Sequence, residues 1–250
     1  MRRGIASLTF IFTLTTAGYA QTKPAPKFGI LDNSFLVEEA FNQEAGIFQN
    51  IFVFTRSEHG QWQGSFTQEW PVMSIRHQLS FAMPFSYADG DGSAGDLALN
   101  YRFQLWEESG KRPAFAPRIT VQLPTSSEHS WPDGVSWQVN LPFSKQIAGV
   151  YFHANAGGTF ESDSNTPFLA GSAIVAIVPM FNVMFEALVQ SAPGDGDERE
   201  VVRIFSPGFR VGWNLGDTQL VAGVAMPITR GAERDTAVLG YFSYELPFRK

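Results

Sequence analysis

Seven charged residues fall at alternating positions within segments whose other alternate positions are apolar. They are Glu69, Arg76, Arg102, Arg118, Glu186, Arg210 and Glu245. Successive side chains of a β-strand point to opposite faces, so these seven would share the polar face of a sheet that is apolar on its other face. Charged side chains gathered in this way can form a constriction that selects ions. Opposed charges can equally pair with one another and fill the interior, and the sequence leaves both interpretations open.

The sequence offers little other chemistry. It contains no metalloprotease helix motif, P-loop, dinucleotide-binding fingerprint or nucleophile elbow, and we assign no catalytic residue, no cofactor and no metal ligand. His153 with Ser136 or Ser172 could form the serine–histidine pair of a lipid hydrolase embedded in a barrel, although no spacing supports it. We therefore predict that the protein is not an enzyme.

Two acidic loops, Asp89–Asp96 and Gly194–Glu198, resemble calcium-binding loops at first sight. An EF-hand needs glycine at its sixth position and glutamate at its twelfth. Counted from Asp89, those positions hold Ala94 and Asn100. We expect a solvated turn in each loop, with a loose surface calcium site as the alternative.

The segment Thr236–Phe248 indicates which elements position the charged residues. From Val238 onward every second residue is apolar, aromatic or glycine, and the intervening set includes Glu245. This period of two, at the C-terminal end of a secreted chain without cysteine, is typical of the closing strand of a bacterial outer-membrane β-barrel. Such chains normally end in phenylalanine, whereas Arg249 and Lys250 follow it here.

The first part of the chain is expected to lie outside the sheet. Residues 1–20 have the charged end, the apolar run Ile5–Leu14 and the small residues that make up a secretory signal peptide. The run is too short to span a bilayer as a helix, so an uncleaved anchor is the lesser alternative. Residues 21–46 include the acidic stretch Ser34–Glu44 and form either a plug of the barrel mouth or a periplasmic segment. Residues 47–250 would form the barrel.

Composition favours a barrel over other membrane and secreted folds. A mean hydropathy of −0.08 is too polar for a bundle of membrane helices and suits strands that are polar on one face. The chain has no cysteine, so a closed ring of paired strands rather than disulfides would hold it together. A formal net charge of −6 argues against a nucleic-acid partner. An aromatic-rich soluble β-sandwich or lipocalin-like barrel has the same period and is the alternative fold.

Glycine and proline interrupt the remaining sequence at short intervals, which is an all-β signal. We expect about twelve strands, an even number as in single-chain bacterial barrels. The expected strands are Ile47–Arg56, Gln61–Trp70, Ile75–Phe85, Gly95–Trp106, Ala114–Leu123, Val135–Phe143, Gly149–Phe160, Phe168–Val178, Phe181–Gln190, Val201–Trp213, Thr218–Ile228 and Thr236–Phe248. The almost wholly apolar stretch Phe168–Val189 would hold two strands and a turn near Pro179, with a single membrane helix as the alternative.

Several segments resemble a family of outer-membrane transporters that is known under the label of the meta-pathway of phenol degradation. The likeness lies in Phe35–Gln49, Gly95–Leu105, Pro117–Thr125, Ser206–Asn214 and the C-terminal strand, and it covers nearly the whole mature chain. The resemblance implies passage or sensing of small compounds, aromatic ones among them, across the outer membrane. It implies no agreed catalytic set, so no residue role is carried over from it.

We therefore predict an all-β protein, a transmembrane antiparallel up-and-down β-barrel of about twelve strands in the outer membrane of a Gram-negative cell. Its predicted function is passive passage of small molecules. Anionic solutes are favoured because arginines outnumber glutamates among the seven lumen charges, and the family resemblance implies aromatic ones. A non-conducting structural or ligand-binding barrel and a barrel-embedded lipid hydrolase are the alternatives. The expected partners are outer-membrane lipid, the barrel assembly machinery and a small solute.

Overall fold

The computed structural model describes residues 29–30, 34–126, 134–194, 198–216, 218–232 and 234–248. The expected signal peptide, the Pro- and Lys-rich stretch at 22–27, the centre of the acidic loop at 195–197 and the last two residues lie outside this range.

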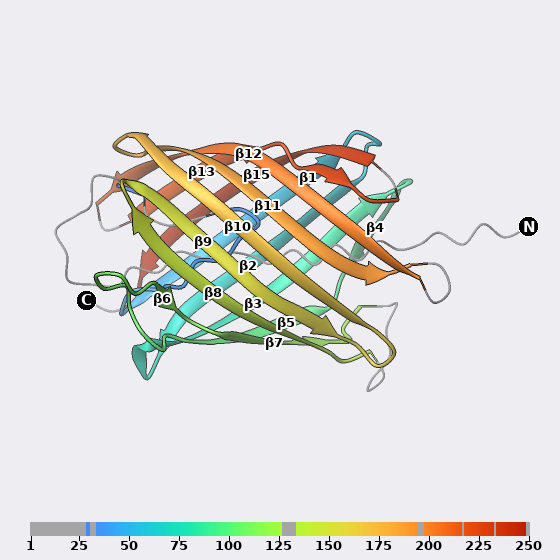
Figure 1. Ribbon diagram of the computed structural model, residues 1–250, viewed down its shortest axis with the longest axis horizontal. Coiled ribbons are helices and arrows are strands. Elements are labelled where there is room, and N and C mark those ends of the chain that lie inside the picture. The colour runs from blue at the N-terminus through green and yellow to red at the C-terminus, as the bar shows by residue number, and fades with distance from the viewer. Residues whose placement is uncertain are drawn as a thin grey trace, which may run out of the picture.

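Within the described residues the chain forms fifteen β-strands and no helix. Their bounds are β1 (Ile47–Ser57), β2 (Trp62–Val72), β3 (Ser74–Ala88), β4 (Asp91–Ala94), β5 (Leu97–Phe103), β6 (Ala114–Phe115), β7 (Arg118–Leu123), β8 (Ser136–Ile147), β9 (Val150–Phe160), β10 (Asn165–Val178), β11 (Phe181–Pro193), β12 (Arg199–Leu215), β13 (Thr218–Ala225), β14 (Ile228–Arg230) and β15 (Arg234–Pro247). Twelve of the described strands form a closed antiparallel ring in which successive strands are neighbours, and the short strands β4, β6 and β14 extend it (Figure 1). The predicted fold is confirmed.

The first and last strands close the ring. β1 pairs with β15 over its whole length, from Ile47 opposite Pro247 to Ser57 opposite Ala237. Aromatic rings pack against each other across this seam, with the ring centroids of Phe48 and Phe248 4.2 Å apart, and such pairs stabilise a fold by about 0.5–1.5 kcal/mol beyond their buried area. A closed ring satisfies the backbone of every ring strand within the sheet, which lipid requires. We call the end where β1 begins and β15 ends the terminal rim, and the opposite end the loop rim.

Alternation along each strand separates a lipid-facing surface from a lumen. On β5 the side chain of Leu99 is 44% exposed, whereas its neighbour Asn100 is 7% exposed and turned inward. On β7 the same contrast holds for Ile119 at 50% and Thr120 at 3%. A shift of one residue would exchange the two faces, so the predicted register is confirmed on these strands.

Proline divides two of the predicted strands. The expected strand Ala114–Leu123 is split into β6 and β7 at Pro117, and Thr218–Ile228 is split into β13 and β14 at Pro227. Proline has no N–H to donate, and the ladder of hydrogen bonds is interrupted at these two positions, although β3, β8 and β12 continue through Pro84, Pro142 and Pro207. The expected strand Gly95–Trp106 is also longer than β5, the strand found there.

The apolar stretch Phe168–Val189 forms the two predicted strands. β10 and β11 pair along most of their length and join at a tight turn after Pro179, where Met180 has a φ of 65°. Among the described residues, no helix is long and apolar enough to cross a membrane.

Candidate functional site

Residues 34–43, which we call the inserted segment, lie inside the barrel (Figure 1). Ser34, Val37, Glu38, Glu39 and Ala40 are each 0% exposed. The segment has no regular secondary structure, so its backbone N–H and C=O groups need partners from elsewhere. Inward side chains of the surrounding strands supply many of them.

On one side, the carboxylate of Glu186 on β11 binds the start of the inserted segment. Its Oε1 accepts hydrogen bonds from the backbone N–H groups of Phe35, Leu36 and Val37, at 2.9, 2.7 and 3.1 Å. Successive N–H groups that converge on one anion form a concave anion-binding arrangement. Here the anion belongs to the protein itself, so this contact fixes the path of the chain.

On the other side, two arginines bind the acidic part of the segment. The Nη2 of Arg102 on β5 lies 3.1 Å from Oε2 of Glu38, and Arg118 on β7 pairs with the other carboxylate oxygen. Arg102 also donates to the carbonyl of Phe41 at 2.7 Å and lies 3.9 Å from Glu39. All of these charged groups are buried, and removal of one partner of a buried ion pair typically costs about 3–5 kcal/mol.

Neutral polar side chains complete the contacts. Asn155 on β9 both accepts from the N–H of Glu38 and donates to its carbonyl, at 2.8 Å in each case. Ser144 on β8 accepts from the N–H of Ala40, and Gln104 donates to the Ala40 carbonyl. The partners lie in the middle and the terminal half of the strands, so the inserted segment occupies that part of the lumen.

Apolar contacts fit the segment closely to the wall. The ring of Phe35 packs against Tyr241 on β15, with centroids 4.9 Å apart. It also lies over Gly223, where a Cβ atom would come within 2.2 Å of the Phe35 ring. Glycine is required at such a close approach because it has no side chain. Ile30 lies against Gly212 in the same way, since a Cβ atom added at Gly212 would come within 2.6 Å of Cγ1 of Ile30.

The segment leaves the lumen at the terminal rim. Asn42 donates to the carbonyl of Ile75 at 3.0 Å, and the side-chain amide of Gln43 donates to Glu245 at 3.2 Å. The neighbouring Glu44 is partly buried, and this burial raises the pKa of its carboxyl group above the ordinary value. The carboxyl group of Glu44 is therefore more easily protonated than that of an exposed glutamate.

Six of the seven residues expected in the lumen face it. Glu69, Arg102, Arg118, Glu186 and Arg210 are buried there, and Glu245 is half-buried and contacts the inserted segment.

The expectation for Arg76 is wrong, because its side chain is exposed at the terminal rim. Its guanidinium donates to the carbonyls of Gln104 and Leu105 and lies 5.0 Å from the outward ring of Phe103. Arg76 lies at the start of β3, where the long side chain can turn away from the lumen toward these neighbours.

Two further lumen charges, Glu38 and Glu39, were not among the sequence candidates. With them, the part of the lumen around the inserted segment holds five carboxylates against three guanidinium groups. The carboxylates are Glu38, Glu39, Glu69, Glu186 and Glu245, and the guanidinium groups are Arg102, Arg118 and Arg210. The excess of arginine expected from the strands alone is therefore reversed.

The serine–histidine pairs considered above take a different form. His153 bonds through Nδ1 to Ser144, at 2.7 Å, and Ser144 also accepts from the N–H of Ala40. Ser172 lies opposite His153 on β10, but its hydroxyl bonds to Ser34 of the inserted segment. These contacts hold the segment in place, with Ser144 and Ser172 facing the lumen rather than lipid.

The acidic loop Asp89–Asp96 forms a β-hairpin. The turn lies between β3 and β4, where Asp89 and Gly90 have φ values of 54° and 94°. Asp96 accepts a hydrogen bond from the N–H of Ser126 at 2.9 Å. The geometry agrees with a turn, and the loop's relation to calcium stays a prediction.

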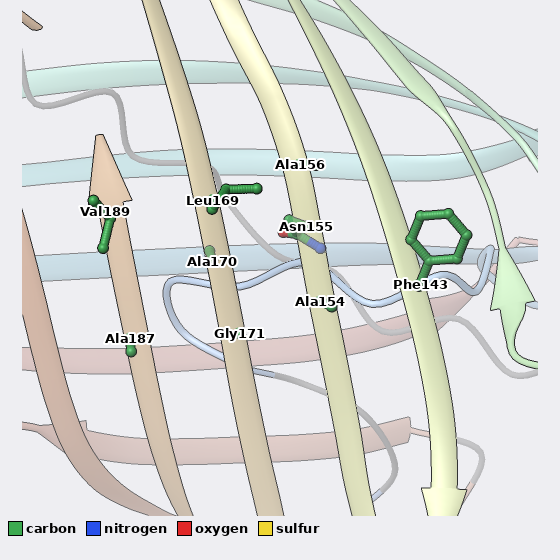
Figure 2. Close-up of a pocket in the computed structure, with 9 residues that line it drawn as sticks. All are labelled: Phe143, Ala154, Asn155, Ala156, Leu169, Ala170, Gly171, Ala187 and Val189. Carbon is green, nitrogen blue, oxygen red and sulfur yellow. The ribbon is translucent and has the colours of Figure 1, made fainter. Parts of the chain in front are cut away.

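A shallow groove lies on the outer surface, away from the lumen (Figure 2). Its volume is about 390 Å³, and its floor includes the small outward residues Ala154, Ala156 and Gly171. Leu169, which is 64% exposed, and Val189 stand at its sides. Because these side chains point to the lipid-facing surface, the groove is not part of a path through the barrel.

Comparison with known proteins agrees with this geometry. The sequence profile of the family described as "Putative MetA-pathway of phenol degradation" matches residues 25–237. The chain belongs to this family. No curated protein matches the chain. Among solved structures, this family member is similar to an outer membrane channel from Pseudomonas putida F1, with a TM-score of 0.60, 11% identity, and coverage of 82% of this chain and 97% of that one. At this identity the similarity establishes the shared barrel fold.

Proposed function

We propose that the protein is a passive channel for small solutes in the outer membrane. Export directed by its signal peptide would bring the chain to this membrane. The closed barrel, the charged and polar lumen, the family and the fold shared with an outer membrane channel all support this. In the proposed channel, the terminal rim faces the periplasm and the loop rim faces the outside of the cell.

The observation that carries the proposal is the inserted segment. It crosses the lumen and is held by ion pairs and hydrogen bonds rather than by covalent links, since the chain has no cysteine. Solutes would pass beside the segment or after it moves. The segment therefore sets the conductance of the channel.

The charge balance of the lumen supports a revised solute class. With five carboxylates against three guanidinium groups, the local field favours cations and neutral molecules over anions. Small neutral aromatic compounds would fit both this field and the family description.

A single-channel recording of the refolded mature chain tests the proposal. We expect a small conductance for the natural sequence and a larger one when residues 34–43 are replaced by a Gly/Ser stretch of equal length. A mobility shift on boiling in detergent shows that both proteins are folded. If neither folded protein conducts, the barrel is a structural or ligand-binding one.

A lipid hydrolase is tested with the same preparations. Release of fatty acid from a phospholipid ester by the natural chain, and its loss in Ser144→Ala, would assign catalysis to the Ser144–His153 pair. We expect no release, because Ser144 faces the lumen and bonds to the inserted segment.

A further inference from the structure

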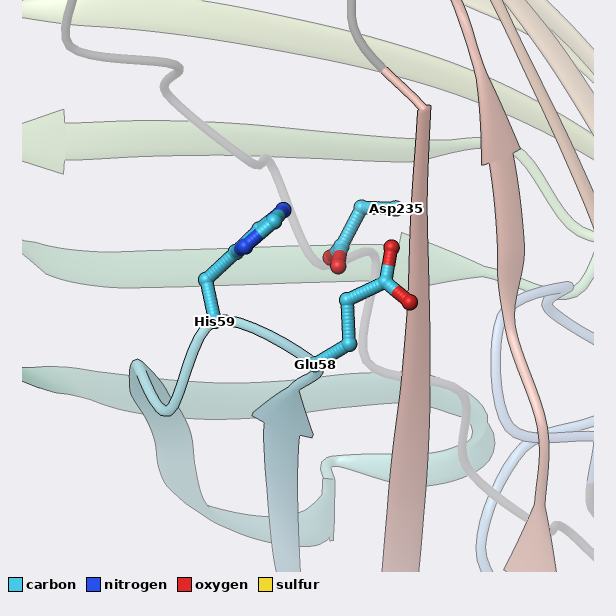
Figure 3. A group of neighbouring side chains, drawn as sticks. All are labelled: Glu58, His59 and Asp235. Carbon is cyan, nitrogen blue, oxygen red and sulfur yellow. The ribbon is translucent and has the colours of Figure 1, made fainter.

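Three side chains with metal-binding atoms converge at the loop rim. Glu58 and His59 lie in the turn after β1, and Asp235 lies near the start of β15 (Figure 3). One ligand atom from each lies within 4.8 Å of the other two. Figure 3 shows the carboxylate of Asp235 between the imidazole ring and the carboxylate of Glu58.

The backbone holds the two contributing elements together. The N–H of Glu58 donates to the carbonyl of Thr236 at 2.9 Å, which continues the β1–β15 ladder by one step. The turn itself is closed by the bond from Ser57 N–H to the Gln61 carbonyl at 2.9 Å and includes Gly60 at a φ of 83°. The three side chains with metal-binding atoms therefore project from a tight turn and a paired strand rather than from a long loop.

The cluster lacks a positive partner among the described residues. No lysine or arginine in the described range forms an ion pair with Glu58 or Asp235, and Oδ1 of Asp235 is buried without a hydrogen-bond partner there. Two carboxylates at this separation repel each other, and a buried oxygen without a partner has lost its hydration. A divalent cation between them would relieve both effects.

We propose that Glu58, His59 and Asp235 form a binding site for a divalent transition-metal ion of the Zn²⁺ type. An imidazole nitrogen with two carboxylate oxygens suits zinc, whereas calcium and magnesium take oxygen ligands alone. Three protein ligands leave a position for water. The ion would join the β1–β2 turn to β15, and so fasten the seam that closes the barrel on its outer side.

Calorimetric titration of the folded mature chain with Zn²⁺ in detergent tests the site. We expect one saturable site, and at least tenfold weaker binding in each of Glu58→Gln, His59→Ala and Asp235→Asn. Asp163→Asn, which removes an exposed acid from the β9–β10 turn on the opposite side of the loop rim, is the matched control and should bind like the natural chain. The mobility shift on boiling confirms that each variant is folded.

A second measurement separates the site from general acidic attraction. Zn²⁺ should raise the unfolding temperature of the natural chain but not that of His59→Ala, and an equal concentration of Ca²⁺ should not displace it. The absence of saturable binding, equal affinities in the natural chain and the three variants, or displacement by equimolar Ca²⁺ would each overturn the proposal.

Discussion

Glu186 is the residue on which the path of the inserted segment depends most directly. Its Oε1 is shared by three consecutive N–H groups, those of Phe35, Leu36 and Val37. A buried N–H group that loses its partner costs about 1–3 kcal/mol. The alanine variant leaves all three without this acceptor, whereas glutamine keeps an oxygen there but loses the charge.

We therefore predict that Glu186→Ala loosens the segment strongly and Glu186→Gln loosens it mildly. Because the chain has no cysteine, Val37→Cys gives a single reactive thiol at a fully buried position. Its labelling by a small thiol reagent should be slowest with Glu186, faster with glutamine and fastest with alanine. Equal rates in the three backgrounds would show that Glu186 does not hold the segment.

Leu99 tests the assignment of the outer face. Leu99 lies near the middle of β5 and is 44% exposed to the surrounding lipid. An arginine on the lipid face costs about 2–4 kcal/mol at the bilayer midplane. We predict that Leu99→Arg lowers the free energy of unfolding in lipid vesicles by this amount, whereas Leu99→Phe changes it little. A loss of similar size in both variants would instead indicate a packing defect.

At the scale of elements, the pairing of β5 with β7 explains why the segment carries two glutamates. Arg102 lies directly opposite Arg118, and both side chains point inward. Like charges at such positions destabilise a sheet unless an opposite charge lies between them. Glu38 supplies this charge to both arginines, and Glu39 lies close to Arg102.

The sequence contains part of this information. The period of two predicts the strands, and it places Arg102 and Arg118 on one face of neighbouring strands. An acidic partner could have been sought in Ser34–Glu44, the nearest acidic stretch outside the strands. The path of that stretch could not be predicted, because its backbone bonds to side chains such as Asn155 and Ser144, and such contacts leave no periodic pattern.

The interruption of strands at proline is a second feature that the sequence pattern does not predict. The period of two continues through Pro117, so the pattern alone joins β6 to β7 although the ladder is interrupted there. The outward orientation of the Arg76 side chain could not be predicted either, because position on a strand does not fix where a long side chain at the end of the strand will lie.

The fit of the segment to β13 gives a prediction for Gly223. A Cβ atom there would come within 2.2 Å of the Phe35 ring, so Gly223→Ala should displace this ring and speed the labelling of Val37→Cys. Gly240→Ala on β15 is the matched control, since its Cβ would meet only a backbone oxygen at 4.0 Å. If Gly223→Ala is labelled as slowly as the control, the ring has room to move without displacing the segment.

At the scale of the whole molecule, the barrel and the segment have separate roles. Closure by β1 and β15 gives a stable wall with an apolar outer face, and this much followed from the sequence. The charge of the lumen could not be predicted from the strand pattern, because it depends on a segment that contributes two carboxylates from outside the sheet.

Ion selectivity tests this combined charge directly. The lumen around the inserted segment holds two more carboxylates than guanidinium groups, five against three, so the natural chain should prefer cations. Glu245→Gln should reduce that preference while preserving contact with Gln43, because an amide can still accept the hydrogen bond. Arg76→Ala should leave it unchanged, because that side chain lies at the rim.

Reversal potentials under a salt gradient measure the preference for each protein. They are best recorded at about 0.1 M salt or below, where the Debye length is about 10 Å or more and the field of the lumen charges is least screened. Anion preference in the natural chain would show that the three arginines, rather than the five carboxylates, control passage. A larger change in Arg76→Ala than in Glu245→Gln would show that the exposed guanidinium of Arg76, rather than the half-buried carboxylate that contacts the inserted segment, controls selectivity.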